Sequence, residues 1–385
     1  MSNIRIFNVN FGDCFLLECG ENAKMLVDYG SSTRLSPAVT TQVNAKLLHA
    51  KHLYLTLTHF HKDHYSGIQK LGGFVQFDEV YLPNFFSKEH FRLQFALLFA
   101  LSPTHESAVI AKNLLSVIPD LQTHLRSDSA ICYVNRGDTI LNRTGNYRIL
   151  WPQLPDSDAE AQRLYRELRP YLESDESILL VNRAADHYFE ALSRTYEDDG
   201  GIRRLAAESI DFERIREVLY SFASSKKRFQ PPKRLTRKLS KAISDYQNSI
   251  CLCFDTDHGN SCSNNGKPAL FLSDIDPANY KIIAAGKDGL KLADVYSAIK
   301  VPHHGTKNYY INDLPESDFL IISNGKSAHS GWEISPLYGL RYIGRELLCT
   351  NYKDACGYEP TGKQCFACDH NYCTCGIGTD DVLPY

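Results

Sequence analysis

The segment THFHKDHYSG, residues Thr58–Gly67, decides the fold, because it places three histidines and one aspartate within six residues. It follows directly on an apolar run at residues 52–57, which predicts a buried strand. Two histidines two residues apart at a strand end can converge on one cation, and the aspartate–histidine pair behind them can turn onto a second. These donor types suit zinc, manganese or iron. The expected metal ligands are His59, His61, Asp63 and His64.

Other segments combine a short apolar strand with polar residues or glycine. They are Asn10–Cys14, Leu26–Gly30, Asn248–Leu252, Leu272–Asp274, Lys300–Thr306 and Ser323–His329. Together with the histidine-rich loop, and in this order, they resemble a metallo-β-lactamase-fold hydrolase. Within that superfamily they are most similar to the ComEC-type branch, the nuclease-like domain of DNA-uptake proteins. The resemblance covers about residues 4–157 and 247–350.

The resemblance implies a four-layer αβ/βα sandwich, with one or two Zn²⁺ or Mn²⁺ ions at one edge between the sheets. It assigns the first two histidines of the loop to one metal and the Asp–His pair to the other. Asp274 would bridge the metals, and either His303 or His304 would complete the second site. Asp28 would orient one of the ligands from behind.

The same resemblance implies a phosphodiesterase or nuclease that uses a metal-activated water on DNA or RNA. Asp63 could orient that water as well as bind metal, and His329 is a candidate acid for the leaving group or a phosphate donor. From its chemistry alone, His329 is equally well explained as a hydrogen-bonded loop histidine. Asn248 and Thr306 are weaker candidates for substrate contacts, because both residue types also cap strand ends and loops.

One feature departs from the superfamily pattern. Many members carry a further histidine between the signature loop and the bridging aspartate, and this chain has no convincing equivalent. His258 stands in a turn and has no further support. The remaining candidates stand in helical, charged surroundings and are expected at the surface: His90, His105, His124 and His187. The first metal site is therefore expected to be weaker, more selective for one metal, or occupied only with substrate.

Two alternatives remain open at this stage. A hydrolase of a cyclic nucleotide, or of another small ester or lactam, would need a closed pocket, whereas a nuclease needs an open, positive groove. A catalytically impaired binding or effector subunit of a larger complex would explain the missing histidine. The presence of both Asp63 and Asp274, which binding alone does not require, favours an enzyme.

Residues 158–246 are expected to form a highly charged helical insertion. Within it, Lys226–Lys241 reads KKRFQPPKRLTRKLSK, with eight basic residues in sixteen and no acidic one. Contact with nucleic-acid phosphates would explain this patch, and a solvated helix face or mobile linker explains it equally well. The candidate phosphate contacts are Lys233, Arg234, Arg237 and Lys238.

Six of the twelve cysteines lie between Cys349 and Cys375. Because four thiolates can close a tetrahedral structural zinc site, residues 351–385 are expected to form a zinc-binding tail. The spacing is short for a zinc ribbon, so Cys356 or His370 could replace one member, and free thiols in an unstructured tail are the alternative. The expected ligands are Cys365, Cys368, Cys373 and Cys375.

Length and charge set the frame for these motifs. A chain of 385 residues with net charge −3 is no globally basic polyanion binder. Its N-terminus lacks a signal-peptide pattern, and no apolar run approaches the roughly 18 residues of a membrane span, so a cytoplasmic protein without membrane contact is expected. The expected fold is an α/β sandwich domain in two halves, residues 1–157 and 247–350. The insertion or the tail could dock a protein partner.

Overall fold

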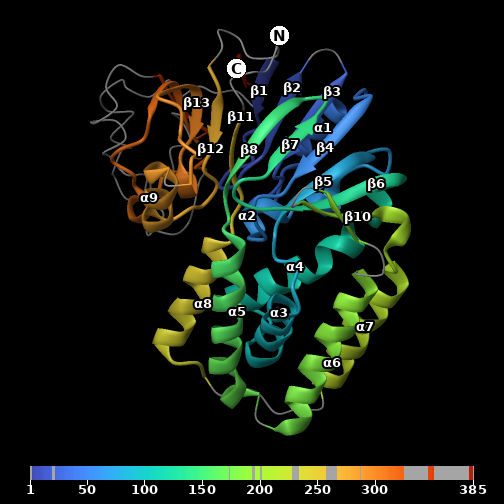
Figure 1. The fold of residues 1–385 in the computed structure, drawn as a ribbon. Helices are drawn as coiled ribbons and strands as arrows, with labels where there is room; N and C mark the ends of the chain where they lie inside the picture. The colour runs from blue at the N-terminus through green and yellow to red at the C-terminus, as the bar shows by residue number, and fades with distance from the viewer. Residues whose placement is uncertain are drawn as a thin grey trace.

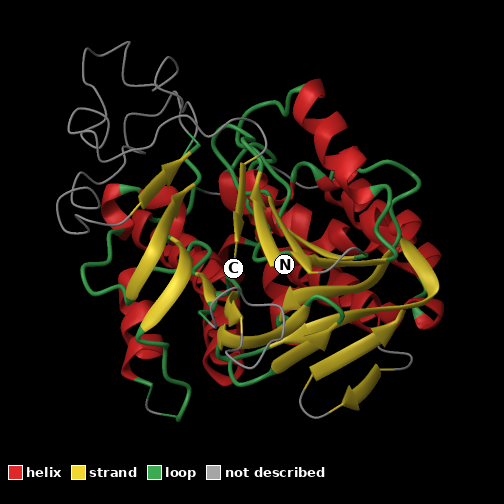
Figure 2. Cartoon of the chain, turned by 90° about the horizontal axis from the view of Figure 1, so that it is seen from above, coloured by secondary structure: helices red, strands yellow, loops and turns green. Residues whose placement is uncertain are grey.

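The computed structural model describes residues 2–19, 22–172, 174–192, 196–199, 202–227, 234–256, 267–286, 288–324, 346–350 and 381–384. Its strands form two mixed sheets, one of nine strands and one of seven. Most of the helices gather below the sheets in Figure 1, and Figure 2 shows the strands with helices on their outer sides. The expected α/β class is therefore confirmed.

The nine-stranded sheet has the order β16-β1-β2-β3-β4-β5-β6-β10-β9. Its four central strands, β3 to β6, are parallel to one another, and the remaining neighbouring pairs are antiparallel. The strands are β1 (Ser2–Ile6), β2 (Phe15–Cys19), β3 (Ala23–Val27), β4 (His52–Thr56), β5 (Phe77–Pro83), β6 (Leu125–Val134), β9 (Tyr196–Asp199), β10 (Ile202–Ala206) and β16 (Asp381–Pro384).

The seven-stranded sheet has the order β15-β14-β13-β12-β11-β8-β7. The four strands from β12 to β15 are parallel, and the pairs from β7 to β12 are antiparallel. The strands are β7 (Thr139–Asn142), β8 (Gly145–Trp151), β11 (Cys253–Thr256), β12 (Ala269–Phe271), β13 (Val295–Lys300), β14 (Glu316–Ile322) and β15 (Glu346–Cys349).

Alternating apolar residues build a core on each face of the sheets. Phe15 and Leu17 point between the sheets, whereas Leu16 points toward the helices, as the two-residue period of a strand requires. Between the sheets, the Phe15 and Phe271 rings lie 5.7 Å apart. The outer face of the nine-stranded sheet packs against α1 (Pro37–Leu47), α3 (Lys88–Ala100) and α4 (Glu106–Leu121), and that of the seven-stranded sheet against α9 (Pro277–Ala285).

The charged segment at residues 158–246 continues this helical layer. The Phe95 ring on α3 contacts that of Phe222, with centroids 4.9 Å apart, and Tyr188 donates to the carbonyl oxygen of Leu115 at 2.6 Å. The apolar residues of the segment thus share the core that covers the nine-stranded sheet. Its helices are α5 (Leu154–Leu168), α6 (Asp175–Leu192), α7 (Phe212–Lys226) and α8 (Arg237–Ser249).

The segment is not helical throughout, since residues 196–199 and 202–206 are strands, and this corrects the expectation of a helical insertion. β9 and β10 form an antiparallel hairpin there, and β10 pairs with β6 at the edge of the large sheet. The charge of Arg204 is compensated by Glu79 at 2.5 Å on β5. A charged strand is therefore stable at this edge, although its sequence lacks the apolar alternation that predicts strands.

No helix in the described ranges is long and apolar enough to cross a membrane.

Candidate metal centre

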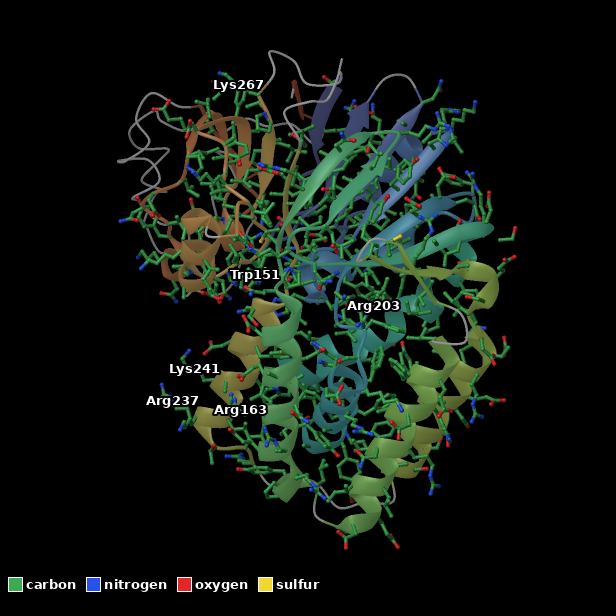
Figure 3. All side chains as sticks on the ribbon, in the orientation of Figure 1. Trp151, Arg163, Arg203, Arg237, Lys241 and Lys267 are labelled. Atoms are coloured by element: carbon green, nitrogen blue, oxygen red, sulfur yellow. The ribbon has the colours of Figure 1, made fainter. Side chains whose placement is uncertain are left out.

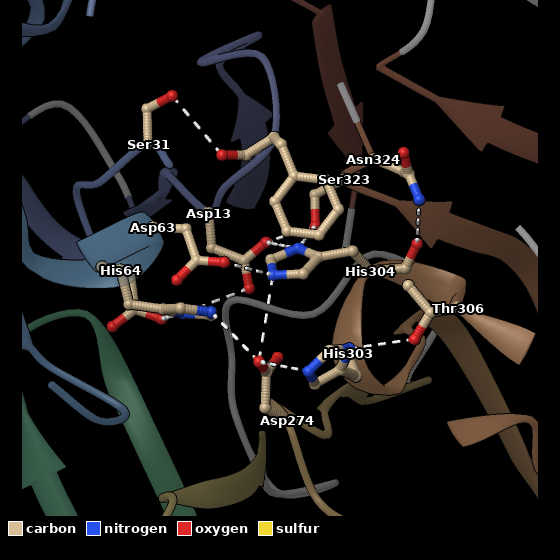
Figure 4. Close-up of polar contacts among 12 residues, drawn as sticks. Asp13, Ser31, Asp63, His64, Asp274, His303, His304, Thr306, Ser323 and Asn324 are labelled. Carbon is tan, nitrogen blue, oxygen red and sulfur yellow. Dashed lines mark hydrogen bonds and ion pairs between the residues drawn. The ribbon is translucent and has the colours of Figure 1, made fainter. Parts of the chain in front are cut away.

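Several chain segments that are distant in sequence meet at one edge of the sheets. The histidine-rich loop follows β4, and other polar residues follow the ends of β3, β12 and β13. Because the carboxyl ends of neighbouring parallel strands lie at the same edge, these side chains are brought together. The β1–β2 loop adds one more carboxylate. The cluster, drawn in part in Figure 4, contains Asp13, Asp28, His59, Asp63, His64, Asp274, His303 and His304.

The loops of the large sheet are locked together by their backbones. The short helix α2 (Lys62–Tyr65) carries Asp63 and His64, whose carbonyl oxygens accept from the N–H groups of Asp13 and Tyr29, each at 2.9 Å. A Cβ atom on Gly30 would lie 2.5 Å from the backbone of this helix. Only glycine fits there, so the glycine supports the close approach on which the cluster depends.

Two groups of side chains in this cluster could hold a metal ion. One group is His59, His64 and Asp274, and the other is Asp13, His64 and His304. Within each group the ligand atoms lie within 4.8 Å of one another, and each of the five residues is at most 1% exposed. His64 belongs to both groups.

The first group has buried atoms that lack partners. Oδ2 of Asp274 lies 3.6 Å from Nε2 of His59 and 3.5 Å from Nε2 of His64. Among the described residues, none of these three atoms has a hydrogen-bond partner, and Oδ1 of Asp274 has none either. A buried polar group left unpaired costs about 1–3 kcal/mol, and a cation would satisfy all of them. Imidazole and carboxylate donors fit zinc, manganese or iron.

Asp28, which the family resemblance assigns to orient a ligand, lies behind a histidine of the cluster. Its Oδ2 is 2.8 Å from Nδ1 of His64, and Thr58 donates to the carboxylate from both its N–H and its hydroxyl at 2.7 Å. Ser273 donates in turn to the Thr58 hydroxyl at 2.8 Å, and Nδ1 of His59 lies 3.1 Å from the same oxygen. Both imidazoles are thus oriented through Nδ1, with Nε2 facing Asp274.

Asp13 belongs to the cluster and Lys300 contacts it, but neither was predicted as a site residue. Oδ1 of Asp13 lies 3.3 Å from Nδ1 of His304, and Ser323 donates to the same oxygen. Lys300 is buried, lies 2.6 Å from Oδ2 of Asp13 and donates to the carbonyl oxygen of Ser273 at 3.0 Å. The sequence offered only one indication that these two residues belong to the site, namely their positions: Asp13 follows a glycine in a turn, and Lys300 ends a buried strand.

His303 and His304, between which the sequence could not choose, both approach Asp274. Nε2 of His303 lies 3.7 Å from Oδ2 of Asp274, and Nε2 of His304 lies 3.9 Å from the same oxygen. The His304 side chain is fully buried and belongs to one of the groups that could hold a metal ion, whereas that of His303 is 16% exposed. This geometry favours His304 as the ligand.

The other two residues of the signature loop lie beside these groups. His61 is partly exposed, and its ring packs edge-on against that of His59 with centroids 4.6 Å apart. Oδ2 of Asp63 lies 3.2 Å from Nε2 of His304. In the described part of the chain, neither residue belongs to a group with converging ligand atoms.

Backbone strain gathers at the cluster. Asp28, Ser273, His303 and His304 have φ angles of 53°, 45°, 45° and 56°, in the left-handed region that non-glycine residues rarely adopt. Asn10 is the one other non-glycine residue with positive φ in the described ranges. Such conformations cost about 1–3 kcal/mol each and occur preferentially at functional sites.

The electrostatics also favour a cation. Burial lowers the pKa of His59 well below its usual value, and His64 and His61 add to the effect, so this imidazole is neutral. Burial alone would lower the pKa of His304 too, but Asp13 and Asp274 raise it to about 9. Burial also opposes the charge of His64, but Asp274, Asp13 and Asp28 raise its pKa well above the usual value, so without a metal both imidazoles carry protons that partly balance the carboxylates. A divalent cation would take the place of these protons.

Three polar residues at the rim connect to His303. Thr306 Oγ1 lies 2.9 Å from its Nδ1, and the Tyr309 ring stacks on its imidazole. Asn248, in the last turn of α8, donates from Nδ2 to the Tyr309 hydroxyl at 2.8 Å. Asn248 and Thr306 were expected as substrate contacts, whereas Tyr309 was not predicted.

Two of the four histidines expected at the surface are buried. His90 is fully buried and bonded through Nδ1 to the Tyr246 hydroxyl at 2.5 Å, and His124 is 5% exposed, with Nδ1 3.0 Å from the carbonyl oxygen of Val75. The expectation was wrong because each imidazole finds a buried hydrogen-bond partner in another part of the chain. His105 and His187 are partly exposed.

The basic residues lie at the far end of α8 from the cluster. Arg234, Arg237 and Lys238 are exposed, and Figure 3 shows the Arg237 side chain projecting outward from the helix. At 1.5 Å per residue, Arg237 lies about 16 Å along the helix from Asn248. Some expected site residues lie outside the described ranges: Lys233, His329, Cys365, Cys368, Cys373 and Cys375.

The chain matches no protein-family model and no curated protein sequence.

Proposed function

We propose that this chain is a metal-dependent hydrolase, and that its two sheets and outer helices form the four-layer αβ/βα sandwich of the metallo-β-lactamase superfamily in its ComEC-type form. One observation carries the proposal: His59, His64 and Asp274 bring unpartnered, buried ligand atoms to a common point. A stable fold without a ligand there would leave these atoms without hydrogen-bond partners. Zn²⁺ and Mn²⁺ are the proposed ions.

A divalent cation at this site would lower the pKa of a water molecule and polarise the oxygen of the bond under attack. The chain's own residues have preparatory roles. Asp28 and Asp13 hold the imidazoles of His64 and His304 by their Nδ1 atoms, so that the rings cannot turn away. Asp63, with its side chain 13% exposed, is accessible to orient an attacking water.

The proposed substrate is a phosphodiester of DNA or RNA. The C-terminal turn of α8 reaches the cluster through Asn248, and exposed basic residues stand at its N-terminal end. Within the described residues neither Arg237 nor Lys238 forms an ion pair, so both are available for phosphates. A nucleic-acid strand long enough to span α8 would contact both the cluster and the basic N-terminal end of the helix. A cyclic nucleotide or small ester would contact only the cluster.

A second candidate function is a binding subunit with impaired chemistry. It is favoured by one observation, that His61 does not converge with His59 and Asp274 on a common point in the described structure. This candidate predicts metal and nucleic-acid binding without turnover. The hydrolase proposal predicts both binding and turnover.

One experiment separates these functions. The purified chain is incubated with single- and double-stranded DNA, RNA and cyclic nucleotides in the presence of Zn²⁺ or Mn²⁺, beside His59→Ala and Asp274→Ala. Bound metal is counted by elemental analysis in the same samples. We expect cleavage by the wild type alone. Metal binding without cleavage of any substrate would favour the binding subunit, and cleavage that survives both substitutions would refute the proposed site.

A further inference from the structure

Tyr309 lies at the rim of the cluster in a fixed orientation. It ends the 3₁₀ turn η7 (Lys307–Tyr309), and its ring lies parallel to the His303 imidazole, with centroids 3.9 Å apart and planes inclined by 6°. His303 in turn places Nε2 3.7 Å from Oδ2 of Asp274. The phenol is thus stacked on a residue that itself contacts the proposed metal site.

The hydroxyl group of Tyr309 has a defined bonding state. Asn248 donates to it from Nδ2 at 2.8 Å, and an amide NH₂ group can only donate. The phenolic oxygen is therefore an acceptor toward Asn248, and its own proton stays available to another acceptor. In the described part of the chain no such acceptor is found. Tyr309 is only partly buried, so a ligand can supply one.

We propose that Tyr309 contacts the substrate, its phenolic O–H donating a hydrogen bond to an anionic oxygen of the phosphoryl group bound at the cluster. The inference rests on the proposed hydrolase function and adds a substrate-binding residue to it. The stack on His303 and the bond from Asn248 fix the donor before the substrate arrives, which reduces the entropy lost on binding. Tyr309 moves no proton in this role; it donates a hydrogen bond only.

The test replaces the hydroxyl and keeps the ring. Tyr309→Phe preserves stacking on His303 and removes the donor, and Tyr220→Phe, at a side chain that is 78% exposed on α7, is the matched control. Two measurements are made on Mn²⁺-loaded full-length protein: kcat and KM for bis(p-nitrophenyl) phosphate, and the affinity for inorganic phosphate by calorimetry. Thermal unfolding and manganese content are measured on the same variants.

We expect Tyr309→Phe to lose about 10- to 150-fold in kcat/KM and to bind phosphate more weakly, the range set by one hydrogen bond to a charged group. Its unfolding temperature and manganese content should match those of the wild type, whereas a purely structural tyrosine would change them first. Wild-type phosphate affinity in Tyr309→Phe overturns the proposal, as does an absence of phosphate binding in the wild type. If the wild type cleaves nothing, the hydrolase proposal fails and the phosphate titration still decides the role of Tyr309.

Asn248→Ala is a second variant, which keeps the phenol of Tyr309 but removes the hydrogen bond that orients its hydroxyl group. Loss of the donor from Asn248 lets the hydroxyl rotate away from the cluster, so we expect a smaller fall in phosphate affinity than in Tyr309→Phe. The double variant should be no weaker than Tyr309→Phe alone, because both substitutions act through one hydroxyl. Fully additive losses would show that Asn248 acts independently and would contradict the proposed positioning.

Discussion

Oδ2 of Asp28 and Nδ1 of His64 lie 2.8 Å apart in a fully buried contact. An ionised carboxylate can only accept hydrogen bonds, so it keeps a proton on Nδ1 and leaves Nε2 for a cation. We expect Asp28→Asn to lower the affinity for Zn²⁺ or Mn²⁺ about 10- to 100-fold, measured by competition with a chromogenic chelator. Asp78→Asn neutralises a carboxylate on β5 that is paired with Arg126 on β6, and this control variant should bind the metal with wild-type affinity. Unchanged affinity in Asp28→Asn would contradict the orienting role.

Metal affinity should rise with pH. The pKa of His304 is raised to about 9 because Asp13 and Asp274 outweigh the effect of burial, so at neutral pH a cation must displace a proton from this imidazole. Raising the pH toward 9 removes that competition. We expect the dissociation constant to fall by up to about tenfold per pH unit between pH 6.5 and 8.5, measured by calorimetry in buffers of different ionisation enthalpy. A pH-independent constant with no proton release would exclude His304 as a ligand.

Gly30→Ala should disrupt the centre without altering any ligand. The added methyl group would meet the backbone of Asp63 and His64 at 2.5 Å, and the backbone cannot yield without moving α2. We expect loss of metal binding and a lower unfolding temperature. Gly73→Ala is the matched control, because a Cβ atom there has no neighbour within 4 Å. Equal behaviour of the two variants would show that the close approach at Gly30 is not required.

Lys300→Met should destabilise the metal-free protein by about 3–5 kcal/mol, because it leaves Asp13 as a buried charge without its ammonium partner. Urea unfolding at pH 7 measures this loss. Lys241→Met, at an exposed pair with Asp245, should change stability little.

The same pair predicts a pH window. Burial alone would raise the pKa of Asp13, but Lys300, His304 and His64 lower it, so its contribution is present above the unfolded value near 4 and is lost as the pH falls. Burial opposes the charge of Lys300, yet Asp13 and Asp274 raise its pKa, so its contribution is lost only as the pH rises past its unfolded value near 10. The variant and the wild type should therefore differ most between about pH 4 and 10. A larger difference at pH 3 would contradict this assignment.

Arg237→Ala/Lys238→Ala should weaken cleavage of an oligonucleotide but leave a small phosphodiester unaffected. Each phosphate contact contributes about one unit to the slope of log affinity against log salt, so the double variant should lower that slope by up to two. The measurement is kcat/KM for a single-stranded oligonucleotide and for bis(p-nitrophenyl) phosphate from 50 to 200 mM salt. Arg214→Ala/Arg216→Ala on α7 is the control for a general loss of positive charge. Equal losses of kcat/KM on both substrates would show that the basic end of α8 does not contact the oligonucleotide.

Sequence reasoning could place the residues whose partners lie close in the chain. The signature loop keeps His59 and His64 within six residues, directly after an apolar strand, so both were expected at the site. The sequence assigned them to different metals, however, whereas the structure groups them together with Asp274. Asp274 and His304 were reached only through the family resemblance, and the structure places both in groups with converging ligand atoms. Which of two adjacent histidines turns inward depends on the backbone angles of the loop, and no periodic pattern encodes those.

Asp13 and Lys300 were missed for a different reason. Their importance arises from a contact between two segments separated by 287 positions in the sequence. The residues next to either one form no pattern that indicates a functional site. The buried His90 shows the opposite error, since a polar sequence context concealed a partner, Tyr246, on another helix. The β9–β10 hairpin was missed because its charges pair across strands. In each case tertiary contacts override local sequence.

The helix α8 ends at Ser249, one residue beyond Asn248, and three residues later the N–H of Leu252 donates to the carbonyl oxygen of Thr58 at 2.7 Å. Helix α8 and the segment that bonds to Thr58 beside the cluster are therefore one continuous piece of chain. The charged segment consequently cannot be exchanged as a cassette, although it interrupts the two halves of the sequence. An engineer who wished to alter this segment would have to keep α8 with its native junction.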